Sequence, residues 1–340
     1  MQTRLLDSDA VRANAPMSAV IDAVEAAFGA AERGDAQMPA KSYIDLPQYN
    51  GDFRSMPAYL SVDSAAPEVA AVDDWDAAGI KWINVHPDNR ERGLPTVLGT
   101  MIYSDPATAF PLAIMDGREL TQLRTGAAAA VATDHLAVDD ATSLGIVGAG
   151  VQSYTQLDAI STVRPIEEVI VADKSPERVA DFIDHFEGEF DVRGGEISGA
   201  AACDVLSTVT PVESPIVDRP AVGDHTHINA IGADAAGKHE LADEILLDAK
   251  LVIDDYEQTT HSGEINVPYS AGTLTDDDIH GALGEIVVGE KAGREAADEI
   301  TVFDSTGLAI QDVAAAHIVY TEATEADSGT TFDLLGLTDS

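Results

Sequence analysis

The 340-residue sequence predicts an α/β fold in which a doubly wound parallel sheet lies between two segments of a smaller α+β unit. Residues 143–253 alternate strands with helices, and the strands are apolar throughout, as in parallel sheets buried on both faces. Residues 41–116 instead hold short extended pieces separated by Pro, Gly and polar turns. A long helix near the C-terminus is placed to return to this first region.

The first region begins with a helix. Apolar residues at helical spacing predict it over 18–33, with Ser18 as a candidate N-cap. A second helix, over 119–137, is rich in small residues and suited to close packing. Between them, the turns indicate a mixed or antiparallel sheet, built from "KSYIDLP", "GDFRSMPAYL", "AGIKWINVHP" and "LPTVLGTMIYSDPATAFPLAIMDG".

In the second region, each strand is expected to lead through a right-handed crossover to the next. "SLGIVGAG" reads as a strand, 151–163 as a helix, "EEVIVAD" as a strand and "SPERVADFIDHFEG" as a helix. Three further strands are expected in "CDVLSTVTP", "THINAIG" and "AKLVIDD", and the returning helix covers 307–326.

Charge is the most unusual feature of the composition. Nineteen Lys and Arg oppose 60 Asp and Glu, a formal net charge of −41. Disorder would require low hydrophobicity, but 45% of the residues are hydrophobic. We therefore expect a folded protein adapted to high salt, where screening weakens the repulsion between surface carboxylates. Such a surface argues against nucleic acid and anionic membranes as partners.

Neither an N-terminal signal peptide nor an apolar run long enough to span a bilayer is evident. The single cysteine, Cys203, excludes an intrachain disulfide and a cysteine-based metal cage, and we expect it to be a packed thiol. These observations predict a cytoplasmic protein.

A glycine-rich turn joins the first buried strand of the parallel sheet to its helix. In "GIVGAGVQS", Gly148 permits a tight turn, Gly150 lets a pyrophosphate approach, and Ser153 stands where a third glycine would fall. The helix N-terminus near Val151 is suited to bind phosphates. An ordinary strand-to-helix turn is the alternative.

The next strand ends at Asp173, some 23 residues after Gly150. A carboxylate at this position accepts hydrogen bonds from the ribose of a dinucleotide and repels a 2′-phosphate, so NAD is favoured over NADP. Lys174 softens that discrimination. The βαβ context favours a dinucleotide site over a plain turn.

Four basic residues are candidates for binding a small anion. Lys81 lies between apolar neighbours in "GIKWIN", which favours a side chain that reaches solvent over one held in a pocket with a lowered pKa. Arg54 and Arg124 each lie beside small or apolar residues and suit a bidentate grip on a carboxylate, with interdomain salt bridges as the alternative. Lys41 is notable only because lysine is scarce.

Asp234 and Lys238 follow the strand "HINAIG", at the carboxyl edge where doubly wound sheets bind ligands. A surface ion pair is the alternative interpretation. His86, His225 and His227 lack the spacing of metal ligands, so no metal is expected. The motifs of hydrolases and kinases are also missing.

Five motifs, in order along nearly the whole chain, resemble the ornithine cyclodeaminase/mu-crystallin family. They are "GIKWINVHPDN…GLPTVLGTMIYSD", "LRTGAAAA", "GIVGAGVQS", "INAIGADAAGKHEL" and "FDSTGLAIQDVAAA". Details such as "MPAKSY" and "IDDYEQTTHSGEINV" are more similar to the archaeal-type alanine dehydrogenases of that family. Ala235 and Ala236 stand where cyclodeaminases tend to carry Cys-Pro.

The resemblance implies a homodimer. It places a substrate-binding and dimerisation domain at 1–123 and 308–340, around an NAD-binding Rossmann domain at 124–307. Lys81 and Asp234 match catalytic positions. The implied substrate contacts are Arg54, Lys41, Thr96 and Arg124. The implied cofactor contacts are Arg124, Thr125, Gly148, Gly150, Val151, Gln152, Asp173, Lys174, Gly232, Ala233, Lys238 and Ser305.

The implied activity is reversible oxidative deamination of L-alanine to pyruvate and ammonium, with hydride transfer to NAD. Ornithine cyclodeamination with recycled NAD and reduction of a cyclic ketimine are the alternatives. A non-catalytic binding role is disfavoured because Lys81, Arg124 and Asp234 are all retained. The substrate's side chain is read by pocket shape, which the sequence does not display.

Overall fold

In the computed structural model, which describes residues 2–63, 66 and 74–336, the chain divides into two units. Unit 1 comprises Met1–Arg124 and Leu308–Ser340, and unit 2 comprises Thr125–Gly307. The division falls inside helix α3 (Gly117–Leu136). Residues 1 and 337–340, at the outer limits of the expected first domain, lie outside the described residues.

Unit 1 is built on a mixed eight-stranded sheet, as expected, with the order β16-β1-β7-β6-β5-β4-β2 and β3 paired to β4. Neighbours are antiparallel except β1 and β7. The strands are β1 (Thr3–Leu6), β2 (Ala36–Gln37), β3 (Ser42–Leu46), β4 (Gly51–Val62), β5 (Trp75–Val85), β6 (Val97–Ser104), β7 (Pro111–Asp116) and β16 (Thr330–Phe332).

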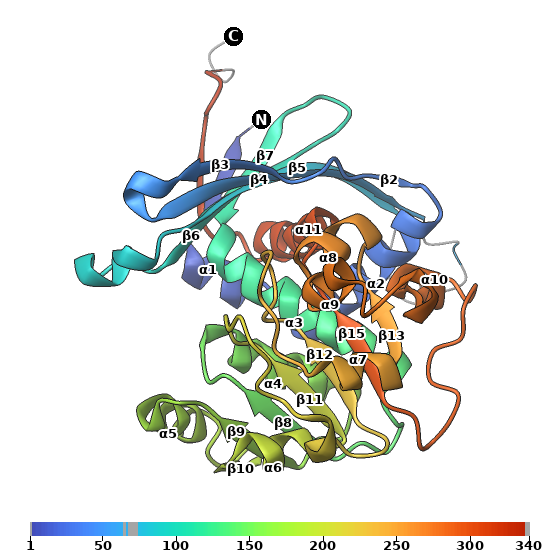
Figure 1. Ribbon diagram of the computed structural model, residues 1–340. Helices are drawn as coiled ribbons and strands as arrows, with labels where there is room; N and C mark the ends of the chain where they lie inside the picture. The colour runs from blue at the N-terminus through green and yellow to red at the C-terminus, as the bar shows by residue number, and fades with distance from the viewer. Residues whose placement is uncertain (1, 64–65, 67–73, 337–340) are drawn as a thin grey trace. The chain divides into compact units, whose positions relative to one another are not determined.

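Helix α11 (Ala309–Glu325) packs on one face of this sheet and against α2 (Met17–Glu32), as Figure 1 shows in red beneath the long blue and teal strands. The expected return of the C-terminal helix is therefore confirmed. A Cβ on Gly79 would lie 2.4 Å from the Met101 side chain and 3.2 Å from that of Val313, so glycine favours the close approach of α11 to β5. Helix α1 (Ser8–Ala13) completes the unit.

The N-cap predicted for α2 is wrong. The helix begins at Met17, Pro16 is its N-cap, and Ser18 lies inside the first turn. The Pro16 carbonyl accepts from Val20 N at 3.0 Å, and the fixed φ of proline suits a helix start.

Unit 2 is a parallel eight-stranded sheet with the order β10-β9-β8-β11-β12-β15-β13-β14, which confirms the doubly wound fold class. In Figure 1 its strands run from green to orange. They are β8 (Ser143–Val147), β9 (Glu168–Ala172), β10 (Asp191–Gly194), β11 (Val205–Thr208), β12 (His227–Ala230), β13 (Lys250–Ile253), β14 (Ile279–Ala282) and β15 (Thr301–Asp304).

Seven further helices belong to unit 2, and α4 covers the residues predicted for it. They are α4 (Val151–Val163), α5 (Pro176–His185), α6 (Ile197–Ala201), α7 (Asp243–Asp248), α8 (Tyr256–Ser262), α9 (Asn266–Ala271) and α10 (Leu283–Val287). Two apolar clusters pack around the sheet, and the core strands β11 and β12 are buried along their whole length. Cys203 is packed in one cluster, and burial raises the pKa of its thiol to about 11.

In the part of the chain that the structure describes, no helix is both long enough and apolar enough to cross a bilayer.

Candidate active site

Lys81 is buried at the centre of unit 1. It lies on β5 with its side chain on the face that α11 covers, and it is 1% exposed. Its Nζ donates to Asp312 Oδ1 at 2.6 Å and to Thr121 Oγ1 at 3.1 Å. The expectation that this side chain reaches solvent is therefore wrong, because α11 closes over its face of the sheet and supplies a buried carboxylate.

Burial lowers the pKa of Lys81 to about 7, and the neighbouring cations Arg124 and Lys41 act in the same direction. Asp312 opposes this shift without cancelling it. An amine with such a pKa is present in both protonation states near neutral pH. Lys81 can therefore act as either acid or base in the same medium.

Asp312 is the principal site residue that the sequence analysis missed. It is 0% exposed, and its Oδ1 lies 2.6 Å from Lys81 Nζ and 3.2 Å from Arg124 Nε. Its Oδ2 is buried without a hydrogen-bond partner among the described residues. The available signal was an acid inside the apolar run "GLAIQDVAAAHIV", on the face of a helix that the sheet buries.

Arg124, on α3, forms an ion pair with the same Asp312 carboxylate. It is 8% exposed, and its Nη1 donates to Gln311 Oε1 at 3.2 Å. The same Gln311 oxygen accepts from Leu308 N at 3.2 Å, at the start of α11. No described hydrogen bond or ion pair uses Arg124 Nη2, which leaves two N–H donors suited to a carboxylate ligand.

The remaining predicted substrate residues are distributed less tightly. Arg54, on β4, shares the Lys81 face of the sheet, where its guanidinium pairs with Asp52 at 2.9 Å and lies over the Tyr43 ring at 5.6 Å. Lys41 is close enough to lower the pKa of Lys81. Thr96 lies before β6 with its carbonyl accepting from His86 N, and no described contact joins it to Lys81.

In unit 2, the predicted phosphate turn joins β8 to α4. Gly148 has φ +106°, which favours glycine strongly, and a Cβ there would lie 2.9 Å from Thr210. Gly150 is the N-cap of α4, makes no side-chain cap, and faces open space where a Cβ would be. Val151 is exposed beside it, and Gln152 Oε1 is buried without a described partner. An open, uncapped helix start fits a pyrophosphate.

Asp173 lies at the end of β9 and braces this turn. Its Oδ2 accepts from Ala149 N at 2.8 Å and its Oδ1 from Ser175 N at 2.7 Å. Lys174 is exposed. The carboxylate is therefore held beside the glycine turn, and its contact with a ribose stays a prediction.

Other predicted cofactor residues follow β12 and β15. Gly232 N donates to Glu240 Oε2 at 2.9 Å, Ala233 is buried, and Ser305 Oγ donates to Asp254. Asp234 and Lys238 form an ion pair, with side chains 40% and 24% exposed. Thr125 is buried in α3, and its carbonyl accepts from Gln156 Nε2 at 3.4 Å.

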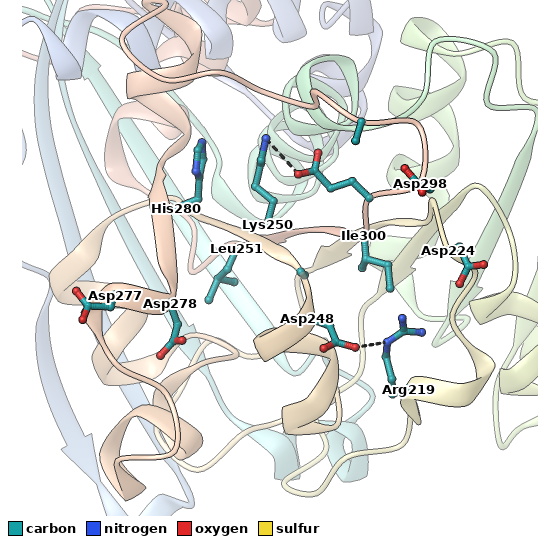
Figure 2. Close-up of a pocket in the computed structure, with 13 residues that line it drawn as sticks. Arg219, Asp224, Asp248, Lys250, Leu251, Asp277, Asp278, His280, Asp298 and Ile300 are labelled. Atoms are coloured by element: carbon teal, nitrogen blue, oxygen red, sulfur yellow. Dashed lines mark hydrogen bonds and ion pairs between the residues drawn. The ribbon is translucent and has the colours of Figure 1, made fainter.

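A cavity of about 730 Å³ opens at the other edge of the unit 2 sheet (Figure 2). Lys250 and Leu251 begin β13 there, and Ile300 immediately precedes β15. The cavity therefore lies at the amino ends of these two strands, whereas the candidate cofactor residue Ser305 follows the carboxyl end of β15. Its ionisable lining is mostly acidic, and Arg219 and Lys250 are paired with acids. The described residues include no group of His, Cys, Asp and Glu able to hold a metal.

A sequence model of the ornithine cyclodeaminase/mu-crystallin family matches residues 1–327. The alanine dehydrogenase of Archaeoglobus fulgidus is 44% identical over 334 residues, which covers 97% of this chain and 98% of that protein.

Two solved structures share the fold at high similarity. An archaeal alanine dehydrogenase dimer with bound NAD has a TM-score of 0.90 and 42% identity, over 98% of this chain and 100% of that one. The Thermococcus litoralis Δ1-pyrroline-2-carboxylate reductase, in complex with NADH and L-proline, has a TM-score of 0.89 and 35% identity, over 96% and 99%.

Proposed function

Since this chain belongs to the ornithine cyclodeaminase/mu-crystallin family, we propose that it is an NAD-dependent alanine dehydrogenase. The reaction converts L-alanine, NAD⁺ and water reversibly into pyruvate, ammonium, NADH and a proton. The observation that carries the proposal is the buried set Lys81, Asp312 and Arg124, which joins a lysine of lowered pKa to a carboxylate-binding guanidinium. The 44% identity to an alanine dehydrogenase supports the substrate.

The cofactor is assigned to unit 2. The turn at Gly148 and Gly150, with the start of α4, holds the pyrophosphate, and Asp173 holds the adenosine ribose and disfavours a 2′-phosphate. When bound, NAD accepts a hydride from the substrate's α-carbon, and NADH returns one in the reverse direction. Support for NAD comes from the two solved relatives with NAD or NADH bound.

The substrate is assigned to unit 1. Arg124 and Arg54 bind the carboxylate of alanine, with Lys41 and Thr96 beside them, and so fix the α-carbon for hydride transfer. Neutral Lys81 takes a proton from the substrate's ammonium group and releases it to solvent after hydride transfer. Neutral again, Lys81 takes a proton from the water that attacks the imine carbon. Asp312 holds the Lys81 amine in place through Oδ1. Asp234, paired with Lys238 in unit 2, stays the second candidate for proton transfer.

Reduction of a cyclic ketimine is the second candidate. The same groups would bind the carboxylate and protonate the ring nitrogen, and a pyrroline-2-carboxylate reductase shares 35% identity and the fold. Ornithine cyclodeamination needs in addition a polar partner for the δ-amino group.

Absorbance of NADH distinguishes these activities. In molar KCl, pyruvate and ammonium together should oxidise NADH, and neither alone should do so. Oxidation with Δ1-pyrroline-2-carboxylate at a higher kcat/KM than with pyruvate and ammonium would assign the reductase instead. Proline formed from L-ornithine without net NADH would assign the cyclodeaminase.

A homodimer is also proposed. Trp82, Leu98 and Ile102, all on the outer face of the unit 1 sheet, are 37–40% exposed, and a dimeric relative supports their burial by a second copy. Light scattering should give twice the chain mass, and Trp82→Glu should reduce it to that of one chain. An unchanged mass for the variant would place the interface elsewhere.

The charge of −41 supports adaptation to high salt, and the cytoplasmic location stays a prediction. The thermal midpoint should rise steadily from low to molar KCl as screening weakens carboxylate repulsion. A midpoint that does not depend on salt would refute the adaptation.

A further inference from the structure

Three buried carboxylates in unit 2 form a series that the proposed chemistry does not use. Asp304 ends β15, Glu264 precedes α9, and Glu240 lies in the segment between β12 and α7. All three are 0% exposed. We call them the carboxylate series.

Each member accepts hydrogen bonds from the backbone that carries the next. Asp304 accepts from Glu264 N at 2.8 Å and from Ile265 N at 3.0 Å. Glu264 in turn accepts through Oε1 from Glu240 N at 2.8 Å and from Leu241 N at 2.6 Å. The position of Glu240 is therefore set by two carboxylates in succession, starting from the interior strand β15.

Glu240 uses both of its oxygens to join the ends of two strands. Oε1 accepts from Thr210 N at 2.8 Å and from Thr210 Oγ1 at 2.6 Å, just after β11, and Oε2 accepts from Gly232 N at 2.9 Å, just after β12. The junction is tight: a Cβ on Gly232 would lie 2.2 Å from Thr210 O and 2.3 Å from Glu240 Oε2.

Backbone N–H groups and the Thr210 hydroxyl satisfy the series, without a lysine or an arginine from the described chain. No Lys or Arg among the described residues forms an ion pair with any of the three, and His239 Nε2 lies 3.7 Å from Glu264 Oε1. Burial raises the pKa of all three carboxyl groups. Burying a carboxylate without a counter-ion costs free energy. We therefore expect the hydrogen bonds that Glu240 accepts from Thr210 and Gly232 to contribute to function.

We propose that Glu240 is a positioning residue for the cofactor loop 232–238, held in place by Glu264 and Asp304. The inference rests on the proposed function only in assigning this loop to NAD. In this role Glu240 acts through the loop and not by contact with substrate or cofactor. Glu240 fixes the position of Gly232, where the loop begins, relative to Thr210. Because the loop is assigned to the cofactor, this position affects the affinity for NADH.

Amide substitutions separate this role from a general need for charge. Glu240→Gln keeps the size of the side chain but leaves it one acceptor oxygen instead of two. Either Gly232 N or Thr210 N then faces the NH₂ group of the glutamine and loses its hydrogen bond. Glu264→Gln keeps Oε1, which alone can serve both of its principal donors. Glu244→Gln, at an exposed position four residues from Glu240, is the matched control.

The experiment is NADH binding by fluorescence in molar KCl, with the thermal midpoint measured beside it. For Glu240→Gln we expect the Kd for NADH to rise about tenfold, the scale of one unsatisfied buried donor, and KM for NADH to rise with it. Its kcat at saturating NADH should stay within about twofold of the wild-type value, since no reacting group is lost. The loss for Glu264→Gln should be smaller, and Glu244→Gln should bind as the wild type does.

A folded Glu240→Gln protein that binds NADH with wild-type affinity would overturn the inference. So would an equal loss in Glu244→Gln, because general charge removal would then explain it. If Glu240→Gln does not fold, Thr210→Val decides, since it removes one donor to Glu240: a weakened Kd supports the role and an unchanged Kd overturns it. Wild-type protein that binds NADH but does not turn over alanine would refute the proposed function alone.

Discussion

Asp312 in unit 1 and Glu264 in unit 2 are both fully buried carboxylates, but different groups compensate them. Asp312 lies between two cations, Lys81 at 2.6 Å and Arg124 at 3.2 Å. Glu264 accepts from backbone N–H groups at 2.6 and 2.8 Å, with no lysine or arginine paired to it in the described chain.

The two solutions suit different tasks. Mobile protons and side-chain charges surround Asp312, so its neighbours can change protonation state during a reaction. Backbone amides cannot be titrated and move only with the chain, so the hydrogen bonds of Glu264 are suited to fixing a loop. We infer that buried charge in unit 1 serves chemistry and buried charge in unit 2 serves position.

The largest effect is expected from Asp312→Asn. Removing this charge leaves Lys81 and Arg124 buried without a counter-ion, at a cost of about 3–5 kcal/mol in unfolding free energy. Turnover should fall by about 10²–10⁴-fold because Lys81 loses its orientation. Denaturant unfolding and kcat/KM measure both, with Glu325→Gln at an exposed position of the same helix as the control. Equal loss in the two variants would contradict the role of Asp312.

The pH dependence of turnover tests the lysine directly. Since the pKa of Lys81 is lowered to about 7, kcat/KM for alanine should rise with pH through that value as the neutral amine forms. The reverse reaction needs the protonated amine, so its rate should fall over the same range.

Lys81→Ala should abolish turnover while NADH binding persists. Retained turnover would remove Lys81 from the mechanism.

Two glycines of the phosphate turn should separate folding from binding within unit 2. Gly148→Ala places a side chain at φ +106° and 2.9 Å from Thr210, so both stability and NADH affinity should fall, the former by about 1–3 kcal/mol. Gly150→Ala meets open space, so the thermal midpoint should hold while NADH affinity drops as the new methyl group blocks the phosphate. Unchanged affinity in Gly150→Ala would move the pyrophosphate away from this turn.

The smallest effect on stability is expected at the half-buried pair Asp234 and Lys238. Lys238→Met should change the unfolding free energy by less than about 1 kcal/mol, because surface pairs contribute little. Denaturant unfolding beside NADH kinetics is the measurement. A raised KM for NADH with unchanged stability would identify Lys238 as a cofactor contact, whereas unchanged kinetics would leave it a surface ion pair.

Much of the fold could be predicted because local patterns carry it. The glycine turn and the helical spacing after it placed α4 at Val151–Val163, as observed. Strands β10 and β14 were missed, because "DVRG" and "IHGA" have neither alternation nor an apolar run. The pairing of β1 with β16 joins residues near opposite ends of the chain, and no local pattern contains it.

The candidate site was predictable only in part. Lys81 and Arg124 could be singled out because isolated bases in apolar surroundings are unusual. Asp312 could not be joined to them, since its contact with Lys81 spans 231 residues and depends on how closely α11 approaches β5 at Gly79. The same tertiary packing reversed the expectation that Lys81 reaches solvent.

The order in which a ribosome delivers these elements has a consequence for unit 1. Lys81 emerges 231 residues before Asp312, and every strand of unit 2 is synthesised in the interval. At about 5–20 residues per second, Lys81 waits roughly 10–50 seconds for its counter-ion. The nascent sheet cannot bury that lysine until α11 appears, so the buried set Lys81, Asp312 and Arg124 is completed at the end of translation, after unit 2 has all of its strands.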